Sequence, residues 1–318
     1  MHSRNVLKMG EQPTVHVFVP VYNEERYLEA TLKSLQSASD YYDERGGYLN
    51  VTVSNNCSTD GSLRIIKEFA KKNSNWEIRN TEKTLSGDQH FNKLIQSCRT
   101  KYICIIGAHD LISRNYFHEL EICLDQSIAS PLVFCKEFVD LNGTGENAQK
   151  VEFRYDFSGV PSNRFWQSIY YLSNATCIQG MIETKKLQSI HAFESQVSDL
   201  VWLHGLLKFG KFTYNENASY IRTNPIRPSE YTDPKVRKLK SGRTAMQISL
   251  LRTWTPPELS MLSIIFARIV IALKFSTKTQ NKVIFQIIRK LSQSSISPAT
   301  RRKETSSHTT PIGEIISN

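Results

Sequence analysis

The feature that most constrains the fold is an alternation of strand-like and helix-like segments over the first 125 residues. Apolar, β-branched runs predict strands, whereas apolar residues that recur every three or four positions predict helices. The predicted strands are residues 15–19, 48–54, 76–79 and 102–106, and the predicted helices are residues 25–37, 62–72 and 87–98. Because such alternation builds βαβ crossovers, we expect a mostly parallel sheet flanked by helices on both faces.

Three of these predicted strands are followed by polar segments. Residues 20–24 (PVYNE) follow the first strand, residues 55–62 (NNCSTDGS) the second, and residues 107–110 (GAHD) the fourth. In open α/β sheets, ligands bind beyond the carboxyl ends of the strands. The sequence therefore predicts that the three segments meet at one edge of the sheet and form a ligand site.

The residue types in these segments favour a nucleotide. Neither a GxGxxG fingerprint nor a Walker loop follows the first strand, which argues against the two common phosphate-binding motifs. Instead, Tyr22 can stack on a base, Asn23 and Glu24 can contact ribose or base edges, and Asn55 and Asp60 can hydrogen-bond to both. Asp60 has a structural alternative, since an acid just before a helix also caps it.

The last third of the chain carries the positive charge. The net charge is +10, and residues 222–303 contain 17 Lys or Arg against three acids. Helices are predicted over residues 258–273 and 281–291. The apolar run Met261–Leu273 is interrupted by Arg268 and is too short for a simple membrane span. Either it packs in a helical subdomain with a solvated basic face, or it contacts anionic lipid at a membrane surface. Nucleic acid is not expected as a partner, because interleaved aromatic residues are lacking.

Cysteine usage and the N-terminus bear on location. The six cysteines are scattered and form no CxxC pair, so structural zinc is not expected. We expect buried thiols in a reducing compartment instead. The first 13 residues are polar, so no signal peptide is expected. We therefore expect a cytoplasmic protein, with peripheral contact at the inner face of the plasma membrane as a further possibility.

Four blocks of the sequence resemble family-two glycosyltransferases. VPVYNEERYLEATLKSL and VSNNCSTDGS are similar to the opening of that family. LSGDQHFN and KYICIIGAHDLIS are similar to its third block, in which a strand ends in an acidic metal motif, and most resemble bacterial polysaccharide glycosyltransferases with Gly-Asp-Asp-Asp there. SDLVWLHGLLKFGKFTYNENASYIRTN resembles the later, acceptor-side block. The resemblance covers about residues 15–224.

The resemblance implies an α/β fold of the GT-A type, like that of nucleotide-diphospho-sugar transferases, to which we add a C-terminal helical appendage. It implies transfer of a sugar from a nucleotide-diphosphate donor to an acceptor hydroxyl with inversion, in bacterial surface polysaccharide or glycolipid synthesis. The acceptor would be a saccharide or a lipid-linked saccharide. The implied donor-pocket residues are Pro20, Tyr22, Asn23, Glu24, Asn55 and Asp60. Asp199 falls on the general base, and Asp110 on the last acid of a motif that binds Mn²⁺ or Mg²⁺.

Two positions depart from the family pattern. Asn55 replaces a base-contacting Asp, which affects the choice of base rather than nucleotide binding itself. The acidic triplet reads Ala108-His109-Asp110, so His109 would serve as a nitrogen ligand, more suited to Mn²⁺ than to Mg²⁺. Alternatively, His109 and Asp110 only shape a loop, and cations stabilise the diphosphate. The candidate cations are Arg222, Lys211 and Arg227.

The acceptor side also leaves alternatives. Asp199 follows Ser198 at a predicted helix start, where it could simply cap the helix. Glu194 is its nearest competitor as a base, and Asp88 could face the donor. The whole chain could also be a non-catalytic nucleotide-sugar-binding relative with a decayed metal site, or a membrane-associated partner protein.

These observations divide the chain into three regions. Residues 14–225 form the glycosyltransferase domain, with residues 14–125 as its nucleotide-sugar-binding half and residues 126–225 as its acceptor half. Residues 226–291 form a basic helical C-terminal region. Residues 292–318 are Ser/Thr-rich and are expected to be a disordered tail.

Overall fold

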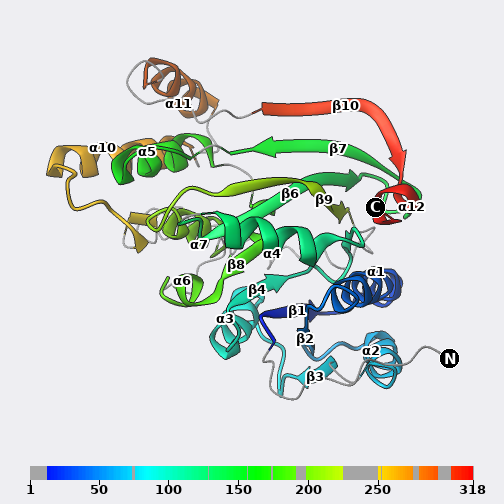
Figure 1. Cartoon of the computed structure of the whole chain (residues 1–318). Helices are drawn as coiled ribbons and strands as arrows, with labels where there is room; N and C mark the ends of the chain where they lie inside the picture. The colour runs from blue at the N-terminus through cyan, green and yellow to red at the C-terminus, as the bar shows by residue number, and fades with distance from the viewer. Residues whose placement is uncertain are drawn as a thin grey trace.

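The computed structural model of the chain shows one large sheet with helices packed on both sides (Figure 1). It describes residues 13–73, 76–127, 129–155, 157–172, 175–190, 198–224, 250–251, 253–274, 279–292 and 302–317. The predicted C-terminal helices are present in this structure, and the fold class predicted from the sequence is confirmed.

The nucleotide-binding half follows the predicted alternation. Its elements are β1 (Val15–Val21), α1 (Glu25–Asp43), β2 (Leu49–Asn55), α2 (Ser62–Ala70), β3 (Trp76–Asn80), α3 (Gly87–Ser97) and β4 (Tyr102–Ile105). The four strands lie in the order β4-β1-β2-β3, and all neighbouring pairs are parallel. The carboxyl ends of β1, β2 and β4 therefore lie at one edge, as the sequence predicts.

The part of the domain that follows β4 is mixed rather than mostly parallel. Its elements are β5 (Leu111–Ile112), α4 (Tyr116–Gln126), β6 (Leu132–Asp140), β7 (Asn147–Arg154), α5 (Pro161–Tyr171), the 3-10 helix η1 (Thr176–Gln179), β8 (Met181–Glu183), α6 (Thr184–Gln188), α7 (Ser198–Leu206) and β9 (Thr213–Thr223). Strand β8 runs antiparallel to β4 and β6, and β7 runs antiparallel to β6, whereas β9 is parallel to β6.

A short turn explains why the predicted parallel arrangement stops here. The Asp140 carboxylate accepts hydrogen bonds from the N–H groups of Gly143 and Gly145, and both glycines have positive φ. This turn joins β6 directly to β7, and two strands joined so closely must be antiparallel.

The C-terminal part contains α10 (Met261–Lys274), α11 (Thr279–Ser292), β10 (Arg302–Pro311) and α12 (Ile312–Ser317). The prediction of a disordered tail over residues 292–318 is wrong for residues 302–317. Strand β10 pairs antiparallel with β7 at the edge of the sheet, and α12 buries Ile312 and Ile315 (Figure 1). A Ser/Thr-rich edge strand is held by its backbone ladder, which composition does not reveal. No helix among the described residues is long and apolar enough to cross a bilayer.

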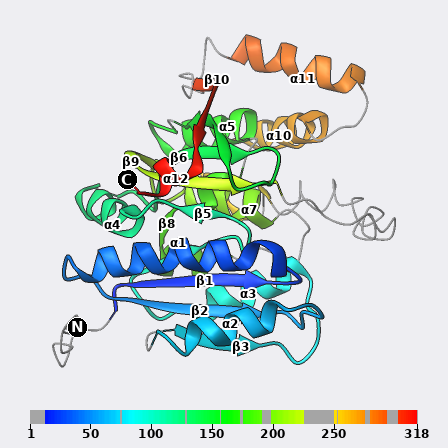
Figure 2. The ribbon, with the colours of Figure 1, turned by 90° about the vertical axis from the view of Figure 1, so that its right-hand side faces the viewer.

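The core lies on the two faces of the sheet. Because strand side chains alternate between faces, Val17 and Val19 of β1 pack with α1, α2 and α4, whereas Phe18 packs on the other side with α3, α5 and α7. Figure 2 shows α1 lying along β1. Helix α10 contributes Ala267, Val270 and Ile271 to the second cluster, so it is part of the main core.

Candidate functional site

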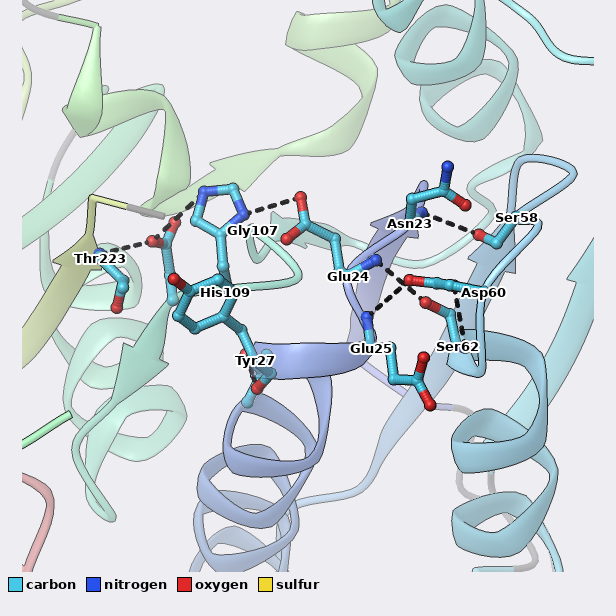
Figure 3. Close-up of polar contacts among 12 residues, drawn as sticks. Asn23, Glu24, Glu25, Tyr27, Ser58, Asp60, Ser62, Gly107, His109 and Thr223 are labelled. Atoms are coloured by element: carbon cyan, nitrogen blue, oxygen red, sulfur yellow. Dashed lines mark hydrogen bonds and ion pairs between the residues drawn. The ribbon is translucent and has the colours of Figure 1, made fainter. Parts of the chain in front are cut away.

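The loops after β1 and β2 are cross-linked by hydrogen bonds. Asn23, which adopts a left-handed φ of 55°, donates its backbone N–H to Ser58 Oγ at 3.0 Å. Its side-chain Oδ1 accepts the Thr59 N–H at 2.7 Å. The Glu24 N–H donates to Ser62 Oγ at 3.0 Å (Figure 3). The two loops predicted to hold the nucleotide therefore form a single braced unit.

Asp60 sits between these loops and caps both helices. Its Oδ2 accepts the Glu25 N–H at 3.0 Å, and its Oδ1 accepts the Ser62 N–H at 3.0 Å (Figure 3). Burial opposes ionisation, but hydrogen bonds from Ser62 and the Glu25 N–H hold the pKa of Asp60 below its usual range. The capping role is thus present in the structure, and a contact between Asp60 and the donor stays a prediction.

The remaining donor-pocket residues differ in how available they are. Asn55 is buried, its Oδ1 accepts the Ser58 N–H at 3.1 Å, and its Nδ2 donates to Asn80 Oδ1 at 3.1 Å. Pro20 lies within β1, opposite Ser54 of β2. The Tyr22 side chain is 40% exposed, so its ring is open to stack on a base. Asn55 thus uses its side chain to hold the loop in place, whereas the exposed ring of Tyr22 can contact a ligand.

Asp110, at the end of the third polar segment, is enclosed by protein. Its side chain is 1% exposed, and it accepts hydrogen bonds from the Tyr220 hydroxyl at 2.6 Å and the Thr223 N–H at 2.9 Å. Burial raises the pKa of Asp110, against the lowering influence of His109 and these two donors. A Cβ atom at Gly107 would overlap Asp110 Oδ2, so this close approach requires glycine.

His109 connects the donor loop to the acidic segment. Its Nδ1 lies 3.1 Å from Glu24 Oε1, and its Nε2 lies 3.8 Å from Asp110 Oδ1 (Figure 3). Only the Nδ1 contact is short enough for a hydrogen bond, and a neutral ring protonated at Nδ1 can make it. The replacement of an acid by His109 therefore places an imidazole between two carboxylates.

This arrangement does not fit a divalent metal held by His109 and Asp110. His109 Nδ1 is within hydrogen-bond distance of Glu24 Oε1, and Asp110 is 1% exposed with both of its oxygens accepting hydrogen bonds from the protein. A metal needs ligand atoms with free lone pairs and an open side for the diphosphate. Within the described part of the chain, no group of three or more His, Cys, Asp or Glu side chains is placed to bind a metal.

A small pocket beside Asp110 contains residues that the sequence patterns did not single out. Glu137 is buried in it and pairs with Arg222, whose Nε lies 3.1 Å from Glu137 Oε1. Burial raises the pKa of Glu137, although Arg222 and the Thr176 hydroxyl oppose the rise. Gln179 lines the same pocket, and its buried Oε1 has no hydrogen-bond partner among the described residues. The pocket thus offers a free acceptor for a ligand hydroxyl.

Among the elements that form this pocket, only β9 lies in a block that the sequence motifs had marked. The predicted acceptor-side block ends in the strand that carries Tyr220, Arg222 and Thr223. Glu137 and Gln179 come from β6 and η1, where no motif marks them.

Asp199 lies in the first turn of α7, as predicted. Burial raises the pKa of its carboxyl to about 6, and the nearby Asp88, in the first turn of α3, adds to the rise. Burial likewise raises the pKa of Cys177 in η1, and both Glu137 and Asp199 lie close enough to contribute. Helix α7 and strand β6, which carry Asp199 and Glu137, both contact η1. Lys211 is exposed, and Glu194 and Arg227 lie outside the described residues.

Comparison with known proteins gives a consistent result. Residues 16–122 match the model of the family described as Glycosyl transferase family 2. Two Bacillus subtilis (strain 168) proteins are similar. The putative glycosyltransferase EpsH is 28% identical over 161 residues, which are 50% of this chain and 44% of that protein. The putative teichuronic acid biosynthesis glycosyltransferase TuaG is 23% identical over 119 residues, which are 37% of this chain and 45% of that protein.

The fold is shared with solved structures. A crystal structure of S. aureus TarS, residues 1–349, aligns with a TM-score of 0.56 and 18% identity, over 88% of this chain and 74% of TarS. The complex of the same TarS fragment with UDP-GlcNAc aligns with a TM-score of 0.58 and 17% identity, over 86% of this chain and 78% of TarS. This chain spans less than half the length of the two Bacillus relatives. The resemblance drawn from the motifs is confirmed for residues 16–122, which match the family model, and the chain shares the GT-A type of α/β fold with TarS.

Proposed function

We propose that this protein transfers a sugar from a nucleoside diphosphate sugar to an acceptor hydroxyl, with inversion at the anomeric carbon. The proposal rests on the raised pKa of the Asp199 carboxylate, which is about 6. It occupies the position that the family resemblance assigns to the general base. A base with a pKa close to neutrality is suited to proton abstraction, because it is ionised at pH 7 and still takes up a proton readily.

The braced loops supply the donor side. Tyr22 would stack on the base, and Asn23 and Glu24 would contact ribose. Because TarS, which shares the fold, has been crystallised with UDP-GlcNAc, a uridine diphosphate sugar is the first donor to test. The unpartnered Gln179 Oε1 would accept a hydrogen bond from a sugar hydroxyl in the pocket beside Asp110.

The reaction would proceed in one displacement. Asp199 takes the proton of the acceptor hydroxyl while that oxygen attacks the anomeric carbon from the face opposite the diphosphate. The new carbon–oxygen bond forms as the bond to the phosphate oxygen breaks, and its electron pair leaves with the diphosphate. General base catalysis of this kind contributes typically about 10²- to 10⁴-fold to the rate.

The leaving diphosphate needs positive charge nearby. Since His109 and Asp110 do not present an open metal site, we assign this role to Arg222, which is 41% exposed beside Asp110. Fixed cations aimed at developing charge can stabilise it without a metal. A bound Mn²⁺ or Mg²⁺ would supply the same neutralisation.

The names of the relatives suggest the acceptor. One is a teichuronic acid biosynthesis glycosyltransferase, and its similarity favours a saccharide or a lipid-linked saccharide of a bacterial surface polysaccharide.

The test is a panel of nucleoside diphosphate sugars, UDP-GlcNAc first, measured by thermal shift and by release of nucleoside diphosphate, with Mn²⁺ or with EDTA. We expect a donor that raises the melting temperature and is hydrolysed or transferred in EDTA. Loss of all turnover in EDTA that Mn²⁺ restores would overturn the assignment of Arg222. Binding without turnover under any condition would favour a non-catalytic nucleotide-sugar-binding protein.

Arg222 and Lys211 provide a matched pair of variants. Both are cations of the acceptor half, but only Arg222 is paired with Glu137 beside Asp110. Arg222→Gln should lower turnover about 10²-fold or more, as for the loss of one transition-state donor. Lys211→Gln should leave it near normal. Equal effects of the two substitutions would contradict the role given to Arg222.

A further inference from the structure

Large apolar side chains are exposed mainly on two helices of this protein. Of the 13 exposed large hydrophobic residues in the described structure, nine lie on α10 and α11. They are Met261, Leu262, Ile265, Phe266, Ile269, Val283, Ile284, Ile287 and Leu291. The other four, Tyr22, Ile122, Leu141 and Val160, lie singly elsewhere. Contiguous exposed apolar surface of this kind marks a binding surface, whereas scattered residues need no explanation.

On α10 the exposed residues form one stripe. Met261, Ile265 and Ile269 follow each other at intervals of four, which places them on the same side of the helix. The opposite side carries Val270 and Ile271, which are fully buried. The helix is therefore fixed to the core by one face and presents a second apolar face outward.

Helix α11 repeats this arrangement. Ile284, Ile287 and Leu291 recur at intervals of three and four, while Phe285 points into the core. The two helices pack against each other, and Figures 1 and 2 both show them together at one end of the molecule. We call α10 and α11 together the apolar hairpin.

The charges on the apolar hairpin are all positive. Arg268 is exposed at the border of the α10 stripe, and Lys282 and Lys290 are exposed on α11. Neither helix contains Asp or Glu. Lys274 is not part of this surface, because its amine donates to backbone carbonyl oxygens of Ile169 and Leu172.

We infer that the apolar hairpin docks on an anionic phospholipid surface. Apolar side chains would enter the boundary between headgroups and acyl chains, and the bordering cations would lie at the level of the phosphates. A second copy of the chain is a poorer match. A symmetric interface would oppose the same patch to itself and bring cations together with no acid on either helix to pair them.

The test uses the full chain and sedimentation with vesicles of phosphatidylcholine, with or without 30% phosphatidylglycerol. Three exposed cations should strengthen binding to the anionic vesicles roughly 100-fold over the neutral ones. The binding should weaken in high salt. Replacing Arg268, Lys282 and Lys290 with Gln should remove the preference for anionic vesicles, and these exposed polar substitutions leave the core intact.

A second variant removes the apolar contribution, with Ile265, Ile269, Ile284 and Ile287 replaced by Ser. It should bind anionic vesicles at least about tenfold more weakly. Its matched control carries Ile122→Ser and Leu141→Ser, two exposed residues outside the hairpin, and should bind like the parent chain. Binding of UDP-GlcNAc in solution should be alike in all variants, so failure of vesicle binding leaves the proposed transfer reaction untouched.

Two results would overturn the inference. One is equal or absent sedimentation of the parent chain with both kinds of vesicle. The other is a stable oligomer in sedimentation velocity that the four-serine variant converts to a monomer, since this would make the hairpin an interface between copies.

Discussion

Asp60 in the nucleotide-binding half and Asp199 in the acceptor half are both carboxylates at the start of a helix, but their surroundings shift their pKa values in opposite directions. Asp60 accepts N–H groups from two helices, and these bonds lower its pKa. Asp199 is shielded from water and faces Asp88, and its pKa is raised to about 6. Asp110, at the end of the nucleotide-binding half, and its neighbour Glu137, in the acceptor half, also have raised pKa values because of burial.

The difference separates structural from chemical roles. A carboxylate whose hydrogen bonds stabilise its charged form supports the fold, because its ionisation is favourable in place. A carboxylate whose ionisation is opposed by burial adds little to stability, and such groups concentrate at sites of chemistry. We therefore expect substitutions in the acceptor half to change turnover, and substitution of Asp60 to change folding.

The largest expected difference concerns turnover. Asp199→Asn removes the proposed base while keeping its shape, so the rate should fall about 10²- to 10⁴-fold. The affinity for UDP-GlcNAc in a thermal-shift titration should stay within about twofold, since the base is not expected to contact the donor diphosphate. Asp43→Asn is a control, because partial desolvation and the nearby Asp40 also raise the pKa of Asp43 to about 6, but Asp43 is exposed at the far end of α1. Near-normal turnover of Asp199→Asn would shift the assignment to Glu194.

The second prediction tests whether the position of Asp110 matters. In Gly107→Ala, the new Cβ would meet Asp110 Oδ2, so the carboxylate must leave its contacts with Tyr220 and Thr223. We expect turnover to fall at least about tenfold and the free energy of unfolding by about 1–3 kcal/mol. A Cβ at Gly87 meets no atom within 4 Å, so Gly87→Ala should be nearly neutral. If Gly107→Ala and Gly87→Ala change turnover equally, the position of the Asp110 carboxylate does not matter for the reaction.

How far the sequence predicts this molecule also differs between the two halves. In residues 15–105, each strand and helix follows from local periodicity, and parallel crossovers leave few alternatives for the sheet. The loops at the strand ends were predicted as a site, and the structure brings them together. The capping of α2 by Asp60 was one of the two roles that the sequence predicted for it. The contacts of Asn55 and the bond from the Glu25 N–H to Asp60 were not predictable, because they depend on the packing of loops that are distant in the sequence.

Around Asp110 and in the acceptor half, the decisive contacts join distant parts of the chain. Asp110 is buried by Tyr220 and Thr223, more than 100 residues later, and Glu137 is paired with Arg222 across β6 and β9. Local patterns carry no information about such contacts. For the same reason, strand β10 could not be recognised from its polar composition, since its partner is β7.

The third prediction concerns stability in the nucleotide-binding half. Asp60→Ala removes the acceptor for N–H groups of both α1 and α2, so the free energy of unfolding should fall by about 1–2 kcal/mol in urea denaturation. Glu68→Ala is the control on the same helix, because Glu68 forms an exposed pair with Arg64 of a kind that contributes about 0.3–0.5 kcal/mol. If Asp60→Ala is as mild as Glu68→Ala but abolishes binding of UDP-GlcNAc, Asp60 acts on the donor and the comparison with Asp199 fails.

The last prediction is the most specific, because the effect has the sign opposite to that expected for an ordinary salt-bridged carboxylate. The folded pKa of Asp199, about 6, lies above the ordinary value of 3.8, so the folded state holds this proton more tightly than the unfolded state does. That contribution to stability is present below about pH 4 and is lost as the pH rises through 6. Asp199→Asn, which carries no charge, should therefore be more stable than the parent by up to about 3 kcal/mol at pH 7.5 and nearly equal to it at pH 4. Urea titrations of both proteins at the two pH values measure this difference. If Asp199→Asn is less stable than the parent at pH 7.5, Asp199 caps α7 as Asp60 caps α1 and α2. If the variant is more stable but has lost turnover, the charged Asp199 side chain serves the reaction and lowers the stability of the fold.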